Sequence, residues 1–188
     1  MEAGKLELVR GFVNTRDYES DSEALSTPHD LSEWLSQHGL LNSDVMASQG
    51  DLTRAIELRE AIRELLAANH DRTTDSAANT ELEGASQVLT AAAARARLAV
   101  EFVPSGGFRF APEATGVNRA VGELPVVAAE AMVDGTWRRL KVCRNDLCQW
   151  AFFDRSRSGA GKWCSMAICG SRQKARAWRA RQRSTREA

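Results

Sequence analysis

The first 142 residues of the chain contain no cysteine, and the sequence opens without the charged leader and apolar segment of an export signal. Disulfide frameworks belong to small secreted domains that are rich in cysteine. The missing leader and the missing cysteines together predict a cytoplasmic protein whose thiols are reduced.

Long apolar runs, internal repeats and low-complexity tracts are also missing. No apolar stretch approaches the length of a membrane span, so we expect no membrane partner. The hydrophobic content of 43% nevertheless supports a globular core, and 188 residues suffice for one ordinary domain and a small satellite.

The chain has no formal net charge, but its two ends are charged oppositely. Residues 1–136 carry 11 lysines and arginines against 22 acidic residues, whereas residues 137–188 carry 14 against three. Such a division indicates a basic module that binds a polyanion, joined to an acidic part that does not. The alternative is that the two parts pack together and neutralise each other.

Patterns of catalytic residues are absent as well. The histidines, His29, His38 and His70, are scattered at the ends of expected helices, and no nucleophile–base spacing or carboxylate pair stands out. We therefore predict that the protein is not an enzyme. The alternative is an active site assembled in three dimensions, which needs a deep pocket with polar groups around Asn14 and Arg59.

All four cysteines lie in one short stretch, as the pairs Cys143 with Cys148 and Cys164 with Cys169. Four residues separate the thiols of each pair, and fifteen residues separate the pairs. This spacing matches the two chelating loops of a tetrahedral zinc ion. An iron–sulfur cluster also uses four cysteines, but its spacings are typically different. Because four thiolates leave no coordination position open, we expect one structural Zn²⁺ ion.

The pattern of apolar residues predicts an α+β fold: a mainly helical N-terminal domain with a small antiparallel sheet, and a small C-terminal four-cysteine zinc module. We place the two domains at residues 1–135 and 136–188. The expected helices span about residues 28–39, 51–71, 79–99 and 124–134, and Thr27 and Pro28 mark the start of the first. The expected strands span residues 6–13, 98–103, 108–111 and 138–142.

A run of good helix formers rich in arginine follows Cys169. On a helix, Arg172, Arg176, Arg179 and Arg183 form a narrow stripe, with Lys174 and Arg181 on the opposite side. Like charges at this spacing oppose an isolated helix, so we expect phosphates to be their counterions. A solvated basic face is the alternative.

The loop between the cysteine pairs extends this positive charge. It adds basic side chains, together with glycines and serines that suit the approach of an anion. We expect the loop and the helix to contact DNA mostly at phosphates, with one or two arginines on guanine edges. The candidate DNA-binding residues are Arg155, Arg157, Lys162, Arg172, Lys174, Arg176, Arg179 and Arg183.

Most of the aromatic rings of the C-terminal part are expected to pack around the metal. A unit of about 50 residues cannot bury enough surface to fold unaided, so metal binding and large rings must supply its core. The same argument predicts that the helix face of Ala175, Trp178 and Gln182 docks on the metal loops. The rings are Trp137, Trp150, Phe152, Phe153, Trp163 and Trp178.

Two sets of motifs resemble a known family. The C-terminal part contains Cys-x4-Cys-x-Trp-x-Phe-x-Asp-x-Ser-Arg, then Lys-Trp-Cys-Ser-Met, then Cys-Gly-Ser-Arg-Gln-Lys-Ala-Arg, and resembles the CGNR-type zinc finger. Upstream, Phe-Val-Asn-Thr at 12–15, Leu-x-x-Trp-Leu at 31–35 and Leu-Arg-Glu-Ala-Ile at 58–62 are similar to the ABATE domain that usually precedes this finger. Ser171 stands where the finger's name-giving asparagine would be, and serine is able to cap the same helix start.

The resemblance implies a bacterial transcription regulator linked to stress responses, with a finger that binds DNA. It also marks Asn14, Thr15 and Arg59 as the characteristic polar residues of the upstream domain, and these are the candidate ligand-binding residues. Arg59 lies on the apolar face of its helix, where a guanidinium needs a partner. It either clamps an anionic small molecule or, as we favour, pairs with a carboxylate or with Asn14 and nearby carbonyls.

The expected partner is double-stranded DNA, which places the protein on the nucleoid when it is bound. RNA or an acidic protein is the alternative partner of the zinc module. A small-molecule effector at the N-terminal domain and a homodimer on a symmetrical operator are further expectations. The chain has no coiled-coil heptads that would announce a dimer.

Overall fold

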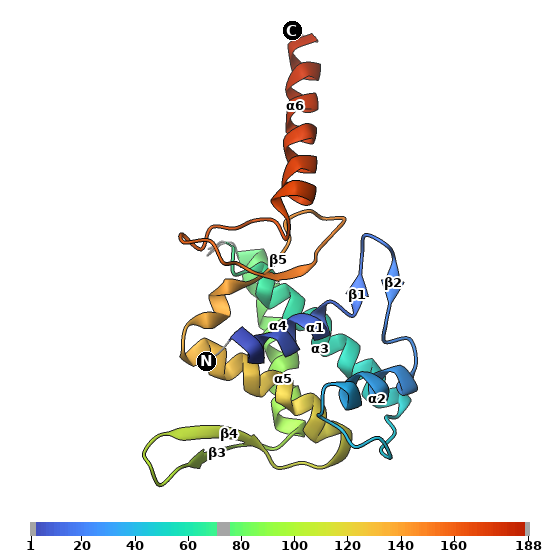
Figure 1. The fold of residues 1–188 in the computed structure, drawn as a ribbon, viewed down its shortest axis with the longest axis vertical. Coiled ribbons are helices and arrows are strands. Elements are labelled where there is room, and N and C mark those ends of the chain that lie inside the picture. The colour runs from blue at the N-terminus through green and yellow to red at the C-terminus, as the bar shows by residue number, and fades with distance from the viewer. Residues whose placement is uncertain (1–2, 71–75, 187–188) are drawn as a thin grey trace.

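The computed structural model of the protein describes residues 3–70 and 76–186. Helices form a body at one end of the molecule, and one helix leaves it alone at the other end (Figure 1). Within the described residues, no helix is both long enough and apolar enough to cross a lipid bilayer. The elements are α1 (Ala3–Val13), β1 (Arg16–Asp17), β2 (Ser22–Glu23), α2 (Pro28–Gln37), α3 (Gln49–Ala67), α4 (Ser76–Arg95), β3 (Leu98–Phe102), β4 (Phe108–Pro112), α5 (Gly116–Val133), η1 (Thr136–Arg139), β5 (Leu140–Val142), β6 (Ala151–Phe153), η2 (Met166–Gly170) and α6 (Ser171–Arg186).

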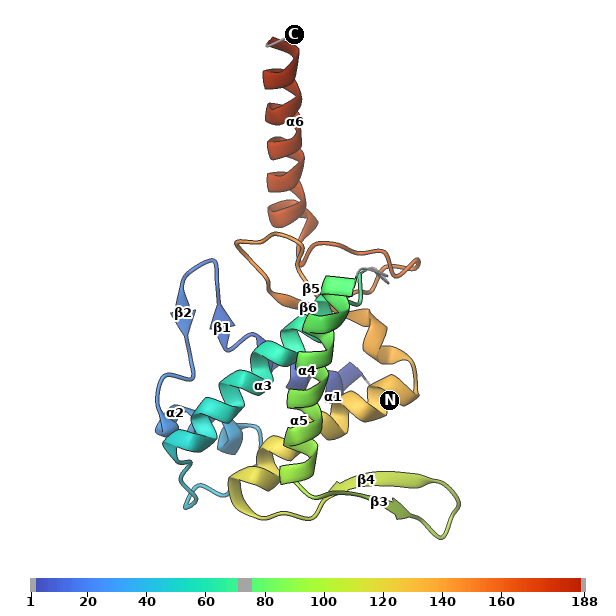
Figure 2. The ribbon, with the colours of Figure 1, turned by 180° about the vertical axis from the view of Figure 1, so that it is seen from behind.

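The body is built around α3, which packs against α1, α2, α4 and α5. Figures 1 and 2 show α3 and α4 side by side from opposite directions. Leu58, Ile62 and Leu66 of α3 are almost completely buried. Their spacing of three to four residues puts them on one helix face, as an amphipathic helix requires.

The expected strand at residues 6–13 is wrong, because this segment is helix α1. Its buried residues are Leu6, Val9, Phe12 and Val13, which recur every three or four positions rather than every second one. The segment is short and apolar, and such runs do not distinguish a strand from a buried helix by composition alone. The helical spacing lets α1 bury one face against α3 and α5.

The predicted start of α2 is confirmed. Thr27 accepts a hydrogen bond from the amide of Asp30, whose carboxylate accepts one from the Thr27 amide, and Pro28 occupies the first helical position. The same reciprocal cap opens α3, where Ser48 and Asp51 exchange the equivalent bonds. Each cap satisfies two amide groups that the helix itself leaves unpaired.

The hairpin predicted after the alanine-rich helix is confirmed: β3 and β4 pair antiparallel, with Glu101 opposite Arg109. The two helices beside it differ from expectation at their ends. Helix α4 is complete by Arg95, and α5 begins at Gly116, eight residues before the predicted start, with Pro125 in its interior. Proline removes one helical hydrogen bond and usually marks a boundary, but burial of the surrounding residues outweighs that loss here. The helix predicted at residues 51–71 corresponds to α3, and its predicted last residue, Asp71, lies outside the described residues.

The basic segment expected as a strand at residues 138–142 is a 3₁₀ turn, η1, followed by the shorter strand β5, which pairs with β6. The buried apolar residues Trp137, Leu140, Val142 and Ala151 belong to the same core as Phe12 of α1. The α+β fold class, with small antiparallel sheets and a C-terminal four-cysteine module, is confirmed. The boundary between residues 135 and 136 stays a prediction.

Candidate zinc centre and nucleic-acid interface

The structure brings the four cysteines together, with all their sulfur atoms within 4.8 Å of one another. The Sγ atom of Cys164 lies 3.7 Å from the Sγ atoms of both Cys148 and Cys169. Four sulfurs bound tetrahedrally to zinc at about 2.3 Å are about 3.8 Å apart. The donor set therefore fits a zinc ion in both chemistry and size.

Two different backbone turns present the two cysteine pairs. Cys143 directly follows β5, and its amide donates to the Trp150 carbonyl at 2.9 Å, while the Cys148 amide donates to the Asn145 carbonyl at 2.7 Å. In the second pair, Cys164 precedes the π-helical turn η2 and Cys169 lies within it, and Ser165 caps the turn by accepting a hydrogen bond from the Ile168 amide at 3.3 Å. The first turn is thus held by the β5–β6 hairpin and the second by the start of the basic helix.

Without a cation, the protein environment disfavours the thiolates of Cys148 and Cys164. Burial raises the pKa of Cys148 to about 12, and burial with the neighbouring Cys143 charge raises the pKa of Cys164 still further. Burial also acts on Cys169, but hydrogen bonds, first that from Asn145, outweigh it and lower the pKa of Cys169. A zinc ion would neutralise the thiolates that burial otherwise penalises.

Asn145 is a functional residue that the sequence analysis missed. It is buried, and its Nδ2 group lies 3.6 Å from the Sγ atom of Cys169 as a hydrogen-bond donor. Its Oδ1 atom accepts a hydrogen bond of 3.4 Å from Arg176 of α6. Asn145 therefore connects the metal centre to the basic helix, as groups in the second layer of metal sites commonly do. Its position between two cysteines was the available signal.

The loop between the cysteine pairs is organised by Asp154, which was also missed. Its buried carboxylate pairs with Lys141 at 2.9 Å and accepts hydrogen bonds from the amides of Ser156 and Gly161 at 3.0 and 2.8 Å. Although burial opposes ionisation, these contacts, first those to Ser156 and Lys141, hold the pKa of Asp154 well below its usual range. A Cβ atom at Gly161 would lie 2.6 Å from this carboxylate, so the turn requires glycine there.

This arrangement changes how the loop relates to an external anion. The amides that the sequence analysis offered to a phosphate are partly occupied by the protein's own carboxylate at Asp154. The three candidate DNA-binding side chains of the loop, Arg155, Arg157 and Lys162, are exposed around it. Their charges remain on the surface while the loop backbone is satisfied internally.

The basic helix α6 stands away from the body and makes its main contacts with η2 (Figures 1 and 2). Arg172, Lys174, Arg176 and Arg179 are exposed on it. Arg172 forms an ion pair with Glu19, which lies in the turn between β1 and β2. The remaining candidate of this helix, Arg183, has a side chain that lies outside the described part.

The predicted packing of the aromatic rings around the metal is confirmed for Trp150 and Trp163 and is wrong for Trp137, Phe153 and Trp178. Trp150 and Trp163 pack against the cysteine cluster, and Trp137 is buried in the main core. Trp178 is 58% exposed, because α6 projects away from the metal loops instead of lying on them. The predicted cap at Ser171 also differs: its hydroxyl donates to the Met166 carbonyl at 3.2 Å, and Ser165 supplies the capping oxygen.

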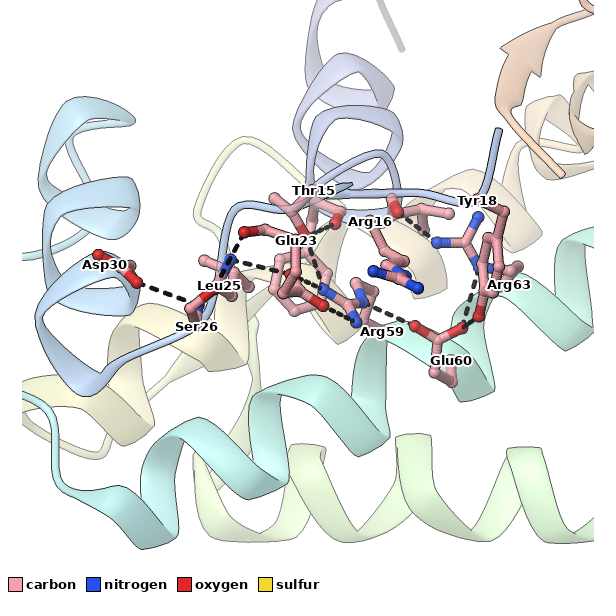
Figure 3. A network of polar contacts seen from close by, with 12 residues as sticks. Thr15, Arg16, Tyr18, Glu23, Leu25, Ser26, Asp30, Arg59, Glu60 and Arg63 are labelled. Atoms are coloured by element: carbon pink, nitrogen blue, oxygen red, sulfur yellow. Dashed lines mark hydrogen bonds and ion pairs between the residues drawn. The ribbon is translucent and has the colours of Figure 1, made fainter. Parts of the chain in front are cut away.

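Arg59 is buried in a network of carboxylates on the N-terminal part (Figure 3). Its guanidinium makes two parallel bonds of 2.7 Å to the Glu23 carboxylate and one of 2.7 Å to Glu60. It also donates to the Thr15 hydroxyl at 3.1 Å. Four of its five N–H groups therefore have protein partners. Arg59 thus pairs with carboxylates, as the favoured interpretation expects, and ligand binding at Arg59 stays a prediction.

Asn14 and Arg63 both bond to the C-terminal part, and Arg63 also shares the Glu60 carboxylate with Arg59. Asn14 exchanges hydrogen bonds of 3.0 and 2.7 Å with the backbone of Ala151 in β6. The buried Arg63 donates to the carbonyls of Val13 and Gln149 at 2.6 and 2.8 Å. These contacts tie α1 and α3 to the first half of the metal module. Sequence analysis noted Asn14 but missed Arg63, which reads as part of a charged helix face.

Comparison with known proteins adds two matches and no curated relative. The model of the ABATE family, described as "Putative stress-induced transcription regulator", matches residues 6–134. The model of the CGNR zinc finger matches residues 139–182, which include the four clustered cysteines, so this part of the chain holds one structural zinc ion. No curated protein matches the sequence. The chain thus belongs to the ABATE family and carries a CGNR zinc finger after its ABATE domain.

Proposed function

We propose that this protein is a bacterial, cytoplasmic transcription regulator that binds double-stranded DNA through its zinc finger and α6. Zinc orders the C-terminal part, and the basic side chains bind phosphates. In this proposal the zinc ligands are Cys143, Cys148, Cys164 and Cys169, and the DNA contacts come from Arg155, Arg157, Lys162, Arg172, Lys174, Arg176, Arg179 and Arg183.

The observation that carries the proposal is the isolation of α6. A helix that contributes to a hydrophobic core has an apolar face against its neighbours, whereas the main contacts of α6 are with the short turn η2. Repulsion between its cations at three- and four-residue spacing destabilises the helix by a few tenths of a kcal/mol per pair. A polyanion removes that repulsion, and the counterions it releases favour binding.

The N-terminal part is proposed to regulate or dimerise rather than to catalyse. Arg59 donates to Thr15 and to the Glu23 carboxylate, and Thr15 donates to the Phe12 carbonyl, which favours a structural role for both residues over a ligand clamp. An effector site at Asn14, Thr15 and Arg59 and a homodimer remain predictions.

The test is the salt dependence of DNA binding by the zinc-loaded full chain. Affinity for a duplex of mixed sequence should fall steeply between low and moderate salt, because each phosphate contact adds about −0.9 to the logarithmic slope. Replacing Arg176 and Arg179 by alanine should reduce that slope by about two. A matched variant, Arg95→Ala with Arg119→Ala, removes the same charge from exposed positions of α4 and α5 and should leave the slope unchanged.

Absence of binding at low salt would overturn the proposal. It would also be overturned if replacing Arg176 and Arg179 by alanine left the salt slope unchanged, as the control variant should. Competition with RNA and with heparin separates the alternatives. Equal binding to every polyanion would show a cationic surface without preference for DNA. Because Arg176 also holds Asn145, zinc content must be measured for that variant, and Arg179→Ala alone provides a change that avoids this contact.

A further inference from the structure

The charges of α6 lie on two opposite sides of the helix. At about 100° per residue, Arg172, Arg176 and Arg179 fall within about 60° of one another, whereas Lys174 and Arg181 lie about 180° away from them. All five residues are exposed. We call the first three the major stripe and the other two the minor stripe.

Two uncharged faces separate the stripes. One consists of Ala175, Trp178 and Gln182, and the other includes Gln173 and Ala177. These residues are exposed except for Ala177, which is half-buried. An amphipathic helix that lies on a flat surface gathers its charges on one side. The division of α6 into four alternating faces does not fit that arrangement.

Partners differ in how many lines of charge they offer to a helix. A single strand of nucleic acid offers one line of phosphates, which one stripe would satisfy. The major groove of B-form DNA is about 12 Å wide, admits an α-helix and has a line of phosphates along each wall. The major groove of double-stranded RNA is too deep and narrow for side chains to read.

We propose that α6 enters the major groove of B-form DNA and contacts the phosphates of both strands. The major stripe binds one strand and the minor stripe, Lys174 and Arg181, binds the other. One uncharged face then lies on the base edges. The 16 residues of α6 span about 24 Å, which is enough to follow the groove past several base pairs. This inference rests on the proposed DNA binding and adds the groove and the strand assignment.

The isolation of α6 makes this placement sterically open. The major stripe contacts the rest of the described chain near the start of the helix, where Arg172 pairs with Glu19 and Arg176 donates to Asn145. Arg179 bonds only within the helix, to the Ala175 carbonyl at 3.2 Å. Figures 1 and 2 show α6 leaving the body from its first turn onward, so a duplex meets no other element along most of the helix.

The experiment compares the zinc-loaded full chain with a minor-stripe variant, Lys174→Ala with Arg181→Ala. Both residues are exposed, and zinc content and circular dichroism check that the variant is folded. On a short duplex, the variant should reduce the salt slope by about two, as the loss of two phosphate contacts predicts. On the corresponding single strand the reduction should be much smaller, because one stripe already serves one line of phosphates. The double variant Arg95→Ala with Arg119→Ala is the matched control.

Groove occupancy is tested with two competitors on the same duplex. Methyl green, which occupies the major groove, should displace the protein, and distamycin, which occupies the minor groove, should not. If the wild-type protein fails to bind any duplex, the proposed function itself fails. If it binds but the minor-stripe variant keeps the wild-type slope, or distamycin displaces it, the two-strand placement is overturned while DNA binding stands.

Discussion

Asn14 and Ala151 exchange two hydrogen bonds across 137 positions of sequence: the side-chain Nδ2 donates to the carbonyl at 3.0 Å, and the Ala151 amide donates to Oδ1 at 2.7 Å. Asn14 thus acts as an additional backbone segment beside β6, at the edge of the sheet that leads into the metal centre. An amide is the one side-chain group that donates and accepts in this geometry.

Replacing Asn14 by alanine should lower the free energy of unfolding of the zinc-loaded protein by about 1–3 kcal/mol, because two backbone groups of Ala151 lose their partner. Chemical denaturation measures the change. Asn42→Ala removes an amide from an exposed position and should stay within about 0.5 kcal/mol of wild type. Equal stability of both variants would contradict the role assigned to Asn14.

Tyr18 is the sole tyrosine of the chain, so its ionisation reports on the Arg59 network directly. Its hydroxyl donates to Glu60 at 3.0 Å. Burial and then the Glu60 charge raise the pKa of Tyr18 above its ordinary value of 10.0. In the Glu60→Gln variant the carboxylate that opposes the tyrosinate is gone, while the positive charges of Arg63 and Arg59 remain. The pKa of Tyr18 should therefore fall.

Ultraviolet absorbance of the tyrosinate measures this titration, and circular dichroism confirms that the fold persists over the pH range used. Glu57→Gln, also on α3, removes the same charge without a contact to Tyr18 and should leave the titration unchanged. An unshifted or raised pKa in the Glu60→Gln variant would refute the described contact.

Zinc binding should release protons and should weaken as the pH falls. Burial raises the pKa of Cys148 to about 12 and raises the pKa of Cys164 further, so both thiols are protonated at neutral pH in the metal-free fold. Zinc binds the thiolates, so at least these two protons must leave. A zinc titration in weak buffer with a pH indicator counts them. The Cys148→Ser variant should release fewer, and a wild-type count near zero would contradict the thiolate site.

The buried pair of Lys141 and Asp154 predicts an asymmetric response to mutation. The two side chains are 3% and 2% exposed, so neither charge has water to replace its partner. Lys141→Met should destabilise the protein by about 3–5 kcal/mol, because it leaves a buried carboxylate without a counterion. Adding Asp154→Asn should restore part of the lost stability, because the side-chain amide oxygen still accepts hydrogen bonds from the backbone amides of the loop. A further loss in the double variant would show that the pair is not the cause.

The ion pair between Glu19 and Arg172 holds an arginine of α6 against the N-terminal part. Glu19→Gln should therefore raise the affinity for duplex DNA at low salt by about two- to fivefold, since exposed pairs contribute up to about 1 kcal/mol. Asp44→Asn, the same change of charge at an exposed position, controls for the overall charge of the protein. An equal increase in both variants would mean that net charge, rather than this contact, sets the affinity.

The sequence predicted the features whose causes are local. The cap at Thr27, the turn between β3 and β4 and the cysteine spacing are each specified within a few residues, and all three agree with the structure. The strand predicted at residues 6–13 failed because its apolar run fits both periods, and only packing against α3 and α5 decides between them.

The missed site residues depend on contacts between distant segments. Asn145 and Asp154 lie in or beside the cysteine motif and Arg63 on a charged helix face, but the contacts that give them their roles form only when β5, β6 and α3 meet. The predicted docking of Trp178 on the metal loops is wrong for a different reason. The C-terminal part does not have to build a core from its own rings alone, because the helical body supplies a core for Trp137. With that core available, the ring on α6 is not required for packing.

The shared core has a consequence for dissecting the protein. A truncation between residues 135 and 136 would strip Trp137, Leu140, Val142 and Ala151 from the apolar cluster that contains Phe12, and would leave Asn14 and Arg63 facing solvent. In the isolated finger, these four apolar residues would be exposed to solvent. If this finger is transferred to another regulator, the α1 and α3 surfaces of the present protein should be transferred with it. Otherwise residues 137–153 should be redesigned.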